Sequence, residues 1–277
     1  MRTYRHSRTR ASLMIDALRS QCHAPRCACV RTATAVIWGM PEPVRYDPPS
    51  RLAYGKESSQ FIEFHRAAGP GPHPLAIMIH GGFWRARYDL HHAEPLCAAL
   101  AAAGFTTANL EYRRVGEPGG GWPGTFDDVT AAVAFARDHA PDFGADSART
   151  FVLGHSAGGH LALWVAAEIP SLTRAVALAP VADLPLAHSL ALSNCAVGEF
   201  LGGAPGEFPA RYAFADPARP TPVPRLLIHG DADTIVPIEL SRRFAAPSTL
   251  IEIPGADHFA VIDPTHAAWR SVLHSIS

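Results

Sequence analysis

The residues best suited to chemistry form the segment Gly154–Gly158, Gly-His-Ser-Ala-Gly, in which small residues flank Ser156. An apolar run, 151–153, precedes it, and a helical pattern begins at Ala157. A sharp strand-to-helix turn needs small flanking residues, because larger side chains would clash there. The turn exposes the hydroxyl at a helix N-terminus, which favours negative charge. The pattern predicts a nucleophilic serine, whereas a chance Gly-x-Ser-x-Gly would lack these flanks.

A hydroxyl is a weak nucleophile at neutral pH, so a serine enzyme also needs a base and a carboxylate that orients the base. Asp231 and Asp233 follow the apolar run 226–229. An imidazole, His258, follows the next apolar run, 249–253. The sequence therefore predicts an acid and a base on consecutive loops, and on spacing alone either aspartate could orient the histidine.

A third candidate feature is the segment His80–Trp84, His-Gly-Gly-Phe-Trp, directly after the apolar run 75–79. Consecutive glycines let backbone N–H groups turn toward a bound oxyanion. The alternative, an ordinary turn capped by His80, is disfavoured by the serine motif in the same chain. We expect Phe83 and Trp84 to wall the pocket, with simple packing of these aromatics as the alternative. The residues predicted to contribute to the substrate pocket are His80, Gly81, Trp84 and His155.

Taken together, these motifs resemble the α/β-hydrolase superfamily over residues 59–277. The acid in that family is the aspartate before x-x-Val-Pro, which in the segment starting at His229 (His-Gly-x-x-Asp-x-x-Val-Pro) is Asp233. The resemblance implies a catalytic triad in the chain order Ser156, Asp233 and His258. It assigns the oxyanion hole to three backbone N–H groups, those of Gly82, Phe83 and Ala157.

The variant His-Gly-Gly-aromatic-Trp, with Glu111–Arg114 and Phe126–Asp128 further on, is similar to arylformamidases (kynurenine formamidases) and related small carboxylesterases. The resemblance implies a serine hydrolase that cleaves a small ester or aryl formamide through an acyl-enzyme. We expect Glu111, Arg113 and Asp128 to be structural. The alternatives are a general short-chain carboxylesterase and a prolyl-oligopeptidase-like peptidase, which usually carries a large gating domain. A non-enzymatic binding module on this fold would normally lack a triad member.

The surrounding pattern predicts an α/β domain. Strand-like runs occur at 60–65, 75–80, 105–110, 151–153, 174–179, 225–229 and 249–253. Helical patterns occur at 93–103, 126–139, 157–168, 237–246 and 264–273. Continuous apolar strands are typical of a parallel sheet that is covered by helices on both faces. We therefore expect a single domain at 40–277 with the α/β-hydrolase fold, a mostly parallel, doubly wound sheet.

Residues 183–222 interrupt this alternation with proline, glycine and short apolar patches. An excursion of this length in a compact domain is often a lid or part of a binding wall. We therefore expect 183–222 to form a lid or a wall of the substrate pocket.

Composition narrows the classes of partner. The chain has 277 residues, 48% of them hydrophobic, and 24 basic against 25 acidic residues. Such a balance creates no global field to attract nucleic acid or an anionic membrane. No apolar run approaches the roughly 18 to 20 residues of a membrane-spanning helix. We expect a small-molecule substrate, no nucleic-acid or membrane partner, no cofactor and no metal. The five cysteines show no disulfide framework, which favours a cytoplasmic location.

Residues 1–39 differ from the rest, with many arginines and one acidic residue, Asp16. They lack the apolar stretch of a secretory signal, and their composition fits either a transit peptide or a disordered leader. A third interpretation, which we favour, is that the start was assigned too early and that Met40 is the first residue. The segment Cys22–Cys29 lacks the second ligand pair of a zinc site, so we interpret its cysteines as incidental thiols.

Overall fold

The structure is a computed structural model that describes residues 48–244 and 248–277. All of these residues belong to one compact unit. The predicted leader at 1–39 and its cysteine segment, 22–29, lie outside the described residues.

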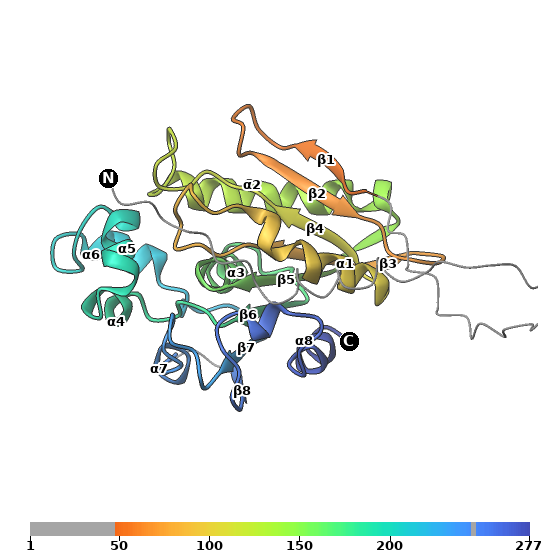
Figure 1. The fold of residues 1–277 in the computed structure, drawn as a ribbon. Helices are drawn as coiled ribbons and strands as arrows, with labels where there is room; N and C mark the ends of the chain where they lie inside the picture. The colour runs from red at the N-terminus through yellow and green to blue at the C-terminus, as the bar shows by residue number, and fades with distance from the viewer. Residues whose placement is uncertain (1–47, 245–247) are drawn as a thin grey trace, which may run out of the picture. The chain divides into compact units, whose positions relative to one another are not determined.

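An eight-stranded sheet forms the centre of the fold, in the order β1-β2-β4-β3-β5-β6-β7-β8 (Figure 1). The β1–β2 and β2–β4 pairs are antiparallel, and all other neighbours are parallel. The prediction of a mostly parallel sheet is therefore confirmed. The strands are β1 (Ser50–Ala53), β2 (Phe61–His65), β3 (His73–Ile79), β4 (Thr106–Leu110), β5 (Ala145–His155), β6 (Arg174–Leu178), β7 (Arg225–Gly230) and β8 (Thr249–Ile253).

Helices connect the strands and cover both faces of the sheet. The α-helices are α1 (Glu94–Ala102), α2 (Gly124–His139), α3 (Ala157–Glu168), α4 (Leu184–Ser189), α5 (Leu192–Leu201), α6 (Pro209–Ala215), α7 (Glu239–Arg242) and α8 (Trp269–Ser275). Local chemistry explains several boundaries. The Asp183 side chain accepts a hydrogen bond from the N–H of Leu186 and so caps α4, while the left-handed Gly104 follows the end of α1.

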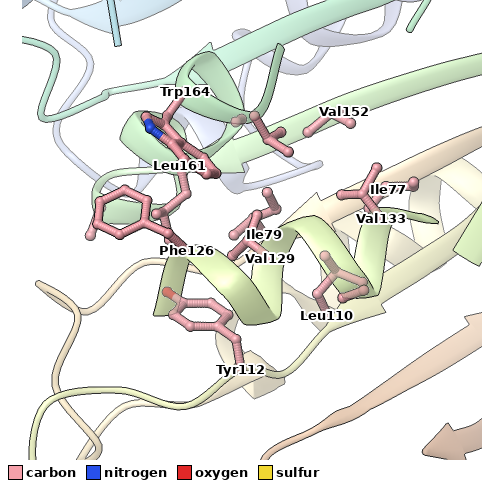
Figure 2. Packing of buried hydrophobic residues seen from close by; sticks show 14 of the residues in the cluster. Ile77, Ile79, Leu110, Tyr112, Phe126, Val129, Val133, Val152, Leu161 and Trp164 are labelled. Atoms are coloured by element: carbon pink, nitrogen blue, oxygen red, sulfur yellow. The ribbon is translucent and has the colours of Figure 1, made fainter. Parts of the chain in front are cut away.

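The alternation of side chains along β3 explains why its buried residues, 75–79, are all apolar. Ile77 and Ile79 point to one face, where they pack in a cluster with residues of α2 and α3, including Phe126 (Figure 2). Ala76 and Met78 point to the other face and pack with α1 and α8. Burying a side chain as large as isoleucine contributes about 1.5 to 3 kcal/mol, so both faces favour the sandwich.

The observed elements differ from the prediction at several places. Strand β5 covers Ala145–His155 instead of 151–153, and α7 covers Glu239–Arg242 within the predicted 237–246. The predicted helix 264–273 begins only at Trp269, because Asp263 accepts a hydrogen bond from the N–H of Thr265, at 2.8 Å, and forms a turn instead. Strand β1 was not predicted, since its four residues are mostly exposed and carry no apolar alternation. The stretch 183–222 contains three short helices, α4, α5 and α6, which gather beyond one end of the sheet (Figure 1).

The loops that follow the parallel strands all lie at one edge of the sheet, the carboxyl edge. The loops after β3, β5, β7 and β8 carry the predicted oxyanion segment, serine, acid and base, respectively. In sheets of this kind, ligands bind outside the carboxyl ends of the strands. No helix within the described ranges is long and apolar enough to cross a membrane.

Candidate active site

Ser156 occupies a strained turn between β5 and α3. Its backbone has φ 57° and ψ −118°, a conformation that non-glycine residues rarely adopt. The neighbouring chain comes so close that a Cβ at Gly154 would lie 2.1 Å from the carbonyl oxygen of Gly158. The N–H of Ser156 donates to the carbonyl of Leu178 at 2.8 Å, which holds the turn against β6. The glycines of the motif are therefore required by close packing of the backbone.

Asp233 is buried, and its carboxylate accepts four hydrogen bonds. One oxygen, Oδ1, accepts from the backbone N–H groups of Ile235 and Val236, each at 2.8 Å. The other, Oδ2, accepts from His258 Nδ1 at 2.6 Å and from His229 Nε2 at 3.1 Å. Burial alone would raise the pKa of Asp233, but the bonds from both histidines and from the backbone outweigh it and lower that pKa well below the usual range.

His229 is a buried partner of the acid. Its Nε2 also lies 2.9 Å from the carbonyl oxygen of Val236, and its Nδ1 lies 2.7 Å from the hydroxyl oxygen of Ser241. Both partners of Nε2 are acceptors, so Nε2 must carry a proton and donate it. The histidine in His-Gly-x-x-Asp therefore fixes the orientation of the Asp233 carboxylate, a role that the sequence analysis did not assign.

Asp231 lies in a different environment from Asp233. It is exposed, and its Oδ1 accepts a hydrogen bond from the N–H of Gly255 at 2.6 Å. That contact joins the loop after β7 to the loop after β8. Of the two carboxylates that the spacing left open, the structure brings Asp233 into contact with His258.

His258 has one ring nitrogen, Nε2, that makes no hydrogen bond within the described part of the chain. Because Nδ1–H donates to Asp233, the lone pair that can take up a proton is on Nε2. Ser156 and His258 line the same cavity. Across residues 48–244 and 248–277, no hydrogen bond joins the serine hydroxyl to the imidazole. Hydrogen bonds of this kind often tighten only when substrate binds.

His155, the residue before the serine, holds the backbone of the base. Its Nε2–H donates to the carbonyl oxygen of His258 at 2.9 Å, and the two rings lie 4.6 Å apart. Burial, together with the nearby imidazoles of His258 and His92, lowers the pKa of His155 well below its usual value. His155 therefore stays neutral, and it ties the serine turn to the loop that carries His258.

The predicted oxyanion donors lie around the serine. Ala157 is the first residue of α3, so its N–H has no partner within the helix. In the described part of the chain, no protein acceptor takes the N–H of Gly82 or Phe83. The N–H of Gly81 instead donates to His92 Nε2 at 3.3 Å. The assignment of the oxyanion hole to Gly82, Phe83 and Ala157 therefore stays a prediction.

The cavity beside Ser156 has a volume of about 310 Å³. Among the described residues, no aspartate, glutamate, lysine or arginine lines it. Three of the lining residues have exposed side chains: Tyr88, Ile235 and Phe259. The mouth of the cavity is therefore apolar. The lining comprises Gly82, Phe83, Tyr88, His92, His155, Ser156, Ile235, His258 and Phe259.

Four of these lining residues were missed by the sequence analysis: Tyr88, His92, Ile235 and Phe259. Phe259 directly follows His258, and Ile235 lies two residues after Asp233. Their positions next to predicted triad residues could therefore have indicated a place in the pocket. Tyr88 and His92 lie in an irregular segment after the glycine pair, where spacing gives no signal.

Three of the four residues predicted for the substrate pocket are absent from the lining. His80 is fully buried, and its Nε2 lies 3.0 Å from Glu111 Oε1. Gly81 is beside the serine, since a Cβ there would lie 3.0 Å from the Ser156 Cβ, but it faces the protein. Trp84 is fully buried beneath the loop. His155 is the fourth residue, and it does line the cavity.

Residues 183–222 also differ from the expected pocket wall. None of them lines the cavity at Ser156. They contribute instead to a second cavity of about 340 Å³, whose lining includes Asp183, Tyr212 and Phe244. The short helices turn their apolar side chains toward α2 and α3, as Phe200 of α5 does in the main core cluster.

The three residues expected to be structural form ion pairs. Arg113 donates to both oxygens of Asp128, at 2.8 and 2.7 Å. Glu111 pairs with Arg114 at 2.8 Å and with His80. These contacts fix the loop after β4 beneath the glycine pair. Among the described residues, no group of three or more histidine, cysteine, aspartate or glutamate side chains could hold a metal ion.

Comparison with known proteins places this geometry in context. A family model described as BD-FAE matches residues 64–174, which include the glycine pair and the serine motif. Esterase LipC of Mycobacterium tuberculosis is 28% identical over 83% of this chain and 66% of its own length. Esterase LipQ of the same organism is 29% identical over 67% of this chain and 50% of its own length. The chain thus spans about two thirds and one half of these curated relatives.

Solved structures share the fold. A truncated carbohydrate esterase from gut microbiota has a TM-score of 0.69 at 22% identity, covering 83% of this chain and 95% of its own. A bacterial heroin esterase has a TM-score of 0.64 at 24% identity, covering 82% and 81%. A thermophilic esterase from Thermogutta terrifontis has a TM-score of 0.64 at 22% identity, covering 82% and 90%. The chain therefore has the α/β-hydrolase fold.

Proposed function

We propose that this chain is a serine esterase that hydrolyses small, uncharged carboxylic esters. One observation carries the proposal: the strained Ser156 shares a cavity with His258, whose Nδ1 donates to the buried Asp233 at 2.6 Å. The names of the relatives LipC and LipQ, both esterases, support the same activity.

In the proposed mechanism, Ser156 Oγ attacks the ester carbonyl carbon while His258 Nε2 takes the hydroxyl proton. The carbonyl oxygen becomes an oxyanion that accepts hydrogen bonds from backbone N–H groups of the glycine loop and of Ala157. The C–O bond to the alcohol then breaks, and the imidazolium returns its proton to the departing oxygen. Water repeats the sequence on the acyl-enzyme, releasing the carboxylic acid and restoring the serine.

Asp233 gives this proton transfer its direction. Its lowered pKa keeps it ionised, so the carboxylate holds His258 in the tautomer with a free Nε2 and stabilises the imidazolium that forms. His155 remains neutral and binds the backbone of His258, so it adds no competing charge beside the imidazolium.

The cavity lining supports an uncharged substrate. No formally charged side chain from the described ranges lines it. Burial together with the nearby His80 lowers the pKa of His92 to about 4, which keeps that ring neutral at physiological pH. An ionic group placed there would lose hydration without gaining a partner. We therefore infer a preference for neutral esters whose apolar groups contact Tyr88, Ile235 and Phe259.

Aryl formamides are the second candidate substrates. Phe83 and Phe259 supply aromatic faces in the cavity, and stacked or edge-on aromatic contacts stabilise an aryl leaving group. An arylformamidase-like activity is compatible with the same nucleophile, since attack on the formyl carbon needs the same base and donors.

Hydrolysis of a substrate panel by the purified protein tests the proposal. We expect turnover of p-nitrophenyl acetate, and we expect Ser156→Ala to abolish it while circular dichroism shows an unchanged fold. N-formylkynurenine and formanilide test the formamide reading, and a peptidyl-proline anilide tests the peptidase alternative. Failure to cleave any ester, or turnover retained by Ser156→Ala, would refute a serine esterase.

We further propose that the protein acts in the cytoplasm and without a metal. Both cysteines within the described residues, Cys97 and Cys195, are free thiols, which fits a reducing compartment. The serine, histidine and aspartate supply the nucleophile, base and charge, so we expect full activity after treatment with EDTA. Cell fractionation tests the location.

A further inference from the structure

Arg85 directly follows the glycine loop, and its side chain binds α5. Its Nε–H donates to Glu199 Oε2 at 2.7 Å, its Nη1 donates to Ser193 Oγ at 3.0 Å, and its Nη2 donates to the carbonyl oxygen of Asn194 at 3.2 Å. The side chain is 14% exposed, so most of the guanidinium is enclosed. All three guanidinium nitrogens therefore contact one helix, more than 100 residues away in the chain.

The loop that Arg85 follows has a strained backbone. Phe83 and Trp84, neither of them glycine, have φ values of 51° and 56°. Residues in this conformation persist only where the surroundings hold them. On one side, the carbonyl of Trp84 accepts from the N–H of Val115 at 2.8 Å. On the other side, the Trp84 indole stacks on Phe200 of α5, with ring centroids 4.5 Å apart and planes within 4°.

The part of α5 that binds Arg85 is strained as well. Ser193, Asn194 and Cys195 have φ values of 49°, 56° and 59° and depart from helical geometry. The Arg85 guanidinium donates to the hydroxyl of the first and the carbonyl of the second. The Arg85 side chain thus connects two strained segments, 83–84 and 193–195. None of the residues in these two segments is a glycine.

We propose that Arg85 is a positioning residue that couples α5 to the predicted oxyanion segment, His80–Trp84 (the oxyanion loop), and holds the N–H groups of Gly82 and Phe83 in place. The inference rests on the proposed function. It gives residues 192–201 a role in catalysis, although none of them lines the cavity. Oxyanion donors act mainly on the transition state, so a displaced loop lowers kcat more than it raises KM.

The first test compares Arg85→Ala with wild type on p-nitrophenyl acetate. We expect kcat to fall about 10- to 100-fold, which is no more than the effect of removing one oxyanion donor. We expect KM to change by less than about threefold. Arg85→Lys keeps the charge but lacks the planar guanidinium, whose three separate nitrogens reach three acceptors, so we expect it to recover only part of kcat.

Arg242→Ala is the matched control. Arg242 is likewise an ion-paired arginine, with Glu239 at 2.9 Å and Glu252 at 2.6 Å, but it lies on α7 and contacts no part of the loop. We expect this variant to keep the wild-type kcat and KM. The comparison separates the general loss of an ion-paired arginine from the loss of this particular coupling.

A double variant, Ser193→Ala with Glu199→Gln, guards against misfolding of Arg85→Ala. It leaves Arg85 in place and weakens two of its three contacts, so we expect a kcat loss of about 3- to 10-fold, smaller than that of Arg85→Ala. Thermal unfolding of every variant is measured alongside, and we expect melting temperatures close to that of wild type, because partly exposed ion pairs add little stability.

The outcomes separate the two proposals. If wild type shows no hydrolase activity, the proposed function fails first. If wild type is active and Ser156→Ala is inactive, but Arg85→Ala and the double variant keep kcat within twofold of wild type, the coupling is refuted. A rise in KM at constant kcat would equally refute it, since that result indicates a substrate contact instead of a positioned oxyanion loop.

Discussion

The two halves of the candidate active site are held together in different ways. In the acid–base half, hydrogen bonds to one buried carboxylate, Asp233, fix the base and the loop after β7. In the oxyanion half, the loop at Phe83 and Trp84 depends on stacking and on Arg85, whose partners lie on α5. The first half is specified by residues close to the acid or on the next loop. The second depends on a helix that approaches from elsewhere in the chain.

This difference predicts a rigid acid–base half and an oxyanion half that responds to changes in α4, α5 and α6. A charge with four donors tolerates little rearrangement, because any lost bond leaves a buried ion underpaired. Aromatic stacking and a partly exposed ion pair are individually weaker. Substitutions should therefore have their largest effects around Asp233 and smaller, graded effects around the loop.

The largest effect is expected for Asp233→Asn. The amide cannot accept all four hydrogen bonds, and its NH₂ group faces donors, so His258 loses its tautomer and its orientation. We expect kcat/KM to fall on the order of 10³- to 10⁴-fold. Steady-state kinetics with p-nitrophenyl acetate measure this loss.

Asp231→Asn is the matched control for that substitution. Asp231 binds only a backbone N–H on the next loop and is exposed, so we expect less than about a threefold change in rate. Equal losses in the two variants would mean that the short contact between Asp233 and His258 does not operate during turnover.

Acyl-chain preference tests the oxyanion half. The cavity of about 310 Å³ is walled by Phe83 and Tyr88, which leaves limited room beside the reacting carbonyl. Overfilling a packed site typically costs about 1 to 3 kcal/mol, which corresponds to about 5- to 150-fold in rate. We expect kcat/KM to fall by that factor between the C2 and C8 p-nitrophenyl esters. A maximum at C8 would show that the loop opens into a lipase-like pocket.

A smaller effect is expected at the junction of the two halves, His155. Replacement by leucine removes the hydrogen bond to the His258 carbonyl, and a bond of this type contributes about 0.5 to 1.5 kcal/mol. We expect kcat to fall up to about tenfold with KM nearly constant. His155→Gln can still donate from its amide, so it should recover most of the rate. Identical losses in the leucine and glutamine variants would exclude the hydrogen bond as the cause.

The smallest effect concerns stability at the helices behind the oxyanion loop. His160 is fully buried, its Nε2–H donates to the carbonyl of Ala215 at 2.8 Å, and burial lowers its pKa to about 4. As pH falls through about 6.5, the unfolded chain takes up a proton that the folded protein refuses. The free energy of unfolding should therefore fall between pH 6.5 and 4, and level out below pH 4.

The size of that change can be measured against His160→Gln. At pH 5.5 wild type should have lost about 1 kcal/mol relative to pH 7.5 through this one group, while the glutamine variant lacks that contribution. Urea unfolding at both pH values gives the difference between the two proteins. Parallel pH profiles for wild type and variant would show that His160 does not stay neutral in the folded protein.

The acid–base half could be predicted from the sequence because its signals are short. Gly154–Gly158 and the Asp-x-x-Val-Pro segment place a turn and a carboxylate at strand ends, and the strands themselves are apolar runs that end at those motifs. The parallel sheet then brings the loops together without further information. The role of His229 was missed, since a histidine within a strand gives no sign of which carboxylate it contacts.

The oxyanion half shows where the sequence information ends. Trp84 follows the glycine pair, and nothing local indicates that its ring turns inward onto Phe200 instead of toward substrate. Likewise, proline and glycine in 183–222 signal an excursion but not which face its helices cover. Those outcomes depend on packing between segments that are distant in the chain, and periodicity does not encode such contacts.

The most direct test of the account is covalent labelling of Ser156. Wild-type protein is treated with a fluorophosphonate, digested and analysed by mass spectrometry, with Ser156→Ala treated in parallel. We expect one label per chain, located on Ser156, with loss of esterase activity in proportion to labelling and no label on the variant. Labelling of another residue with equal loss of activity, or full activity after Ser156 is labelled, would contradict it.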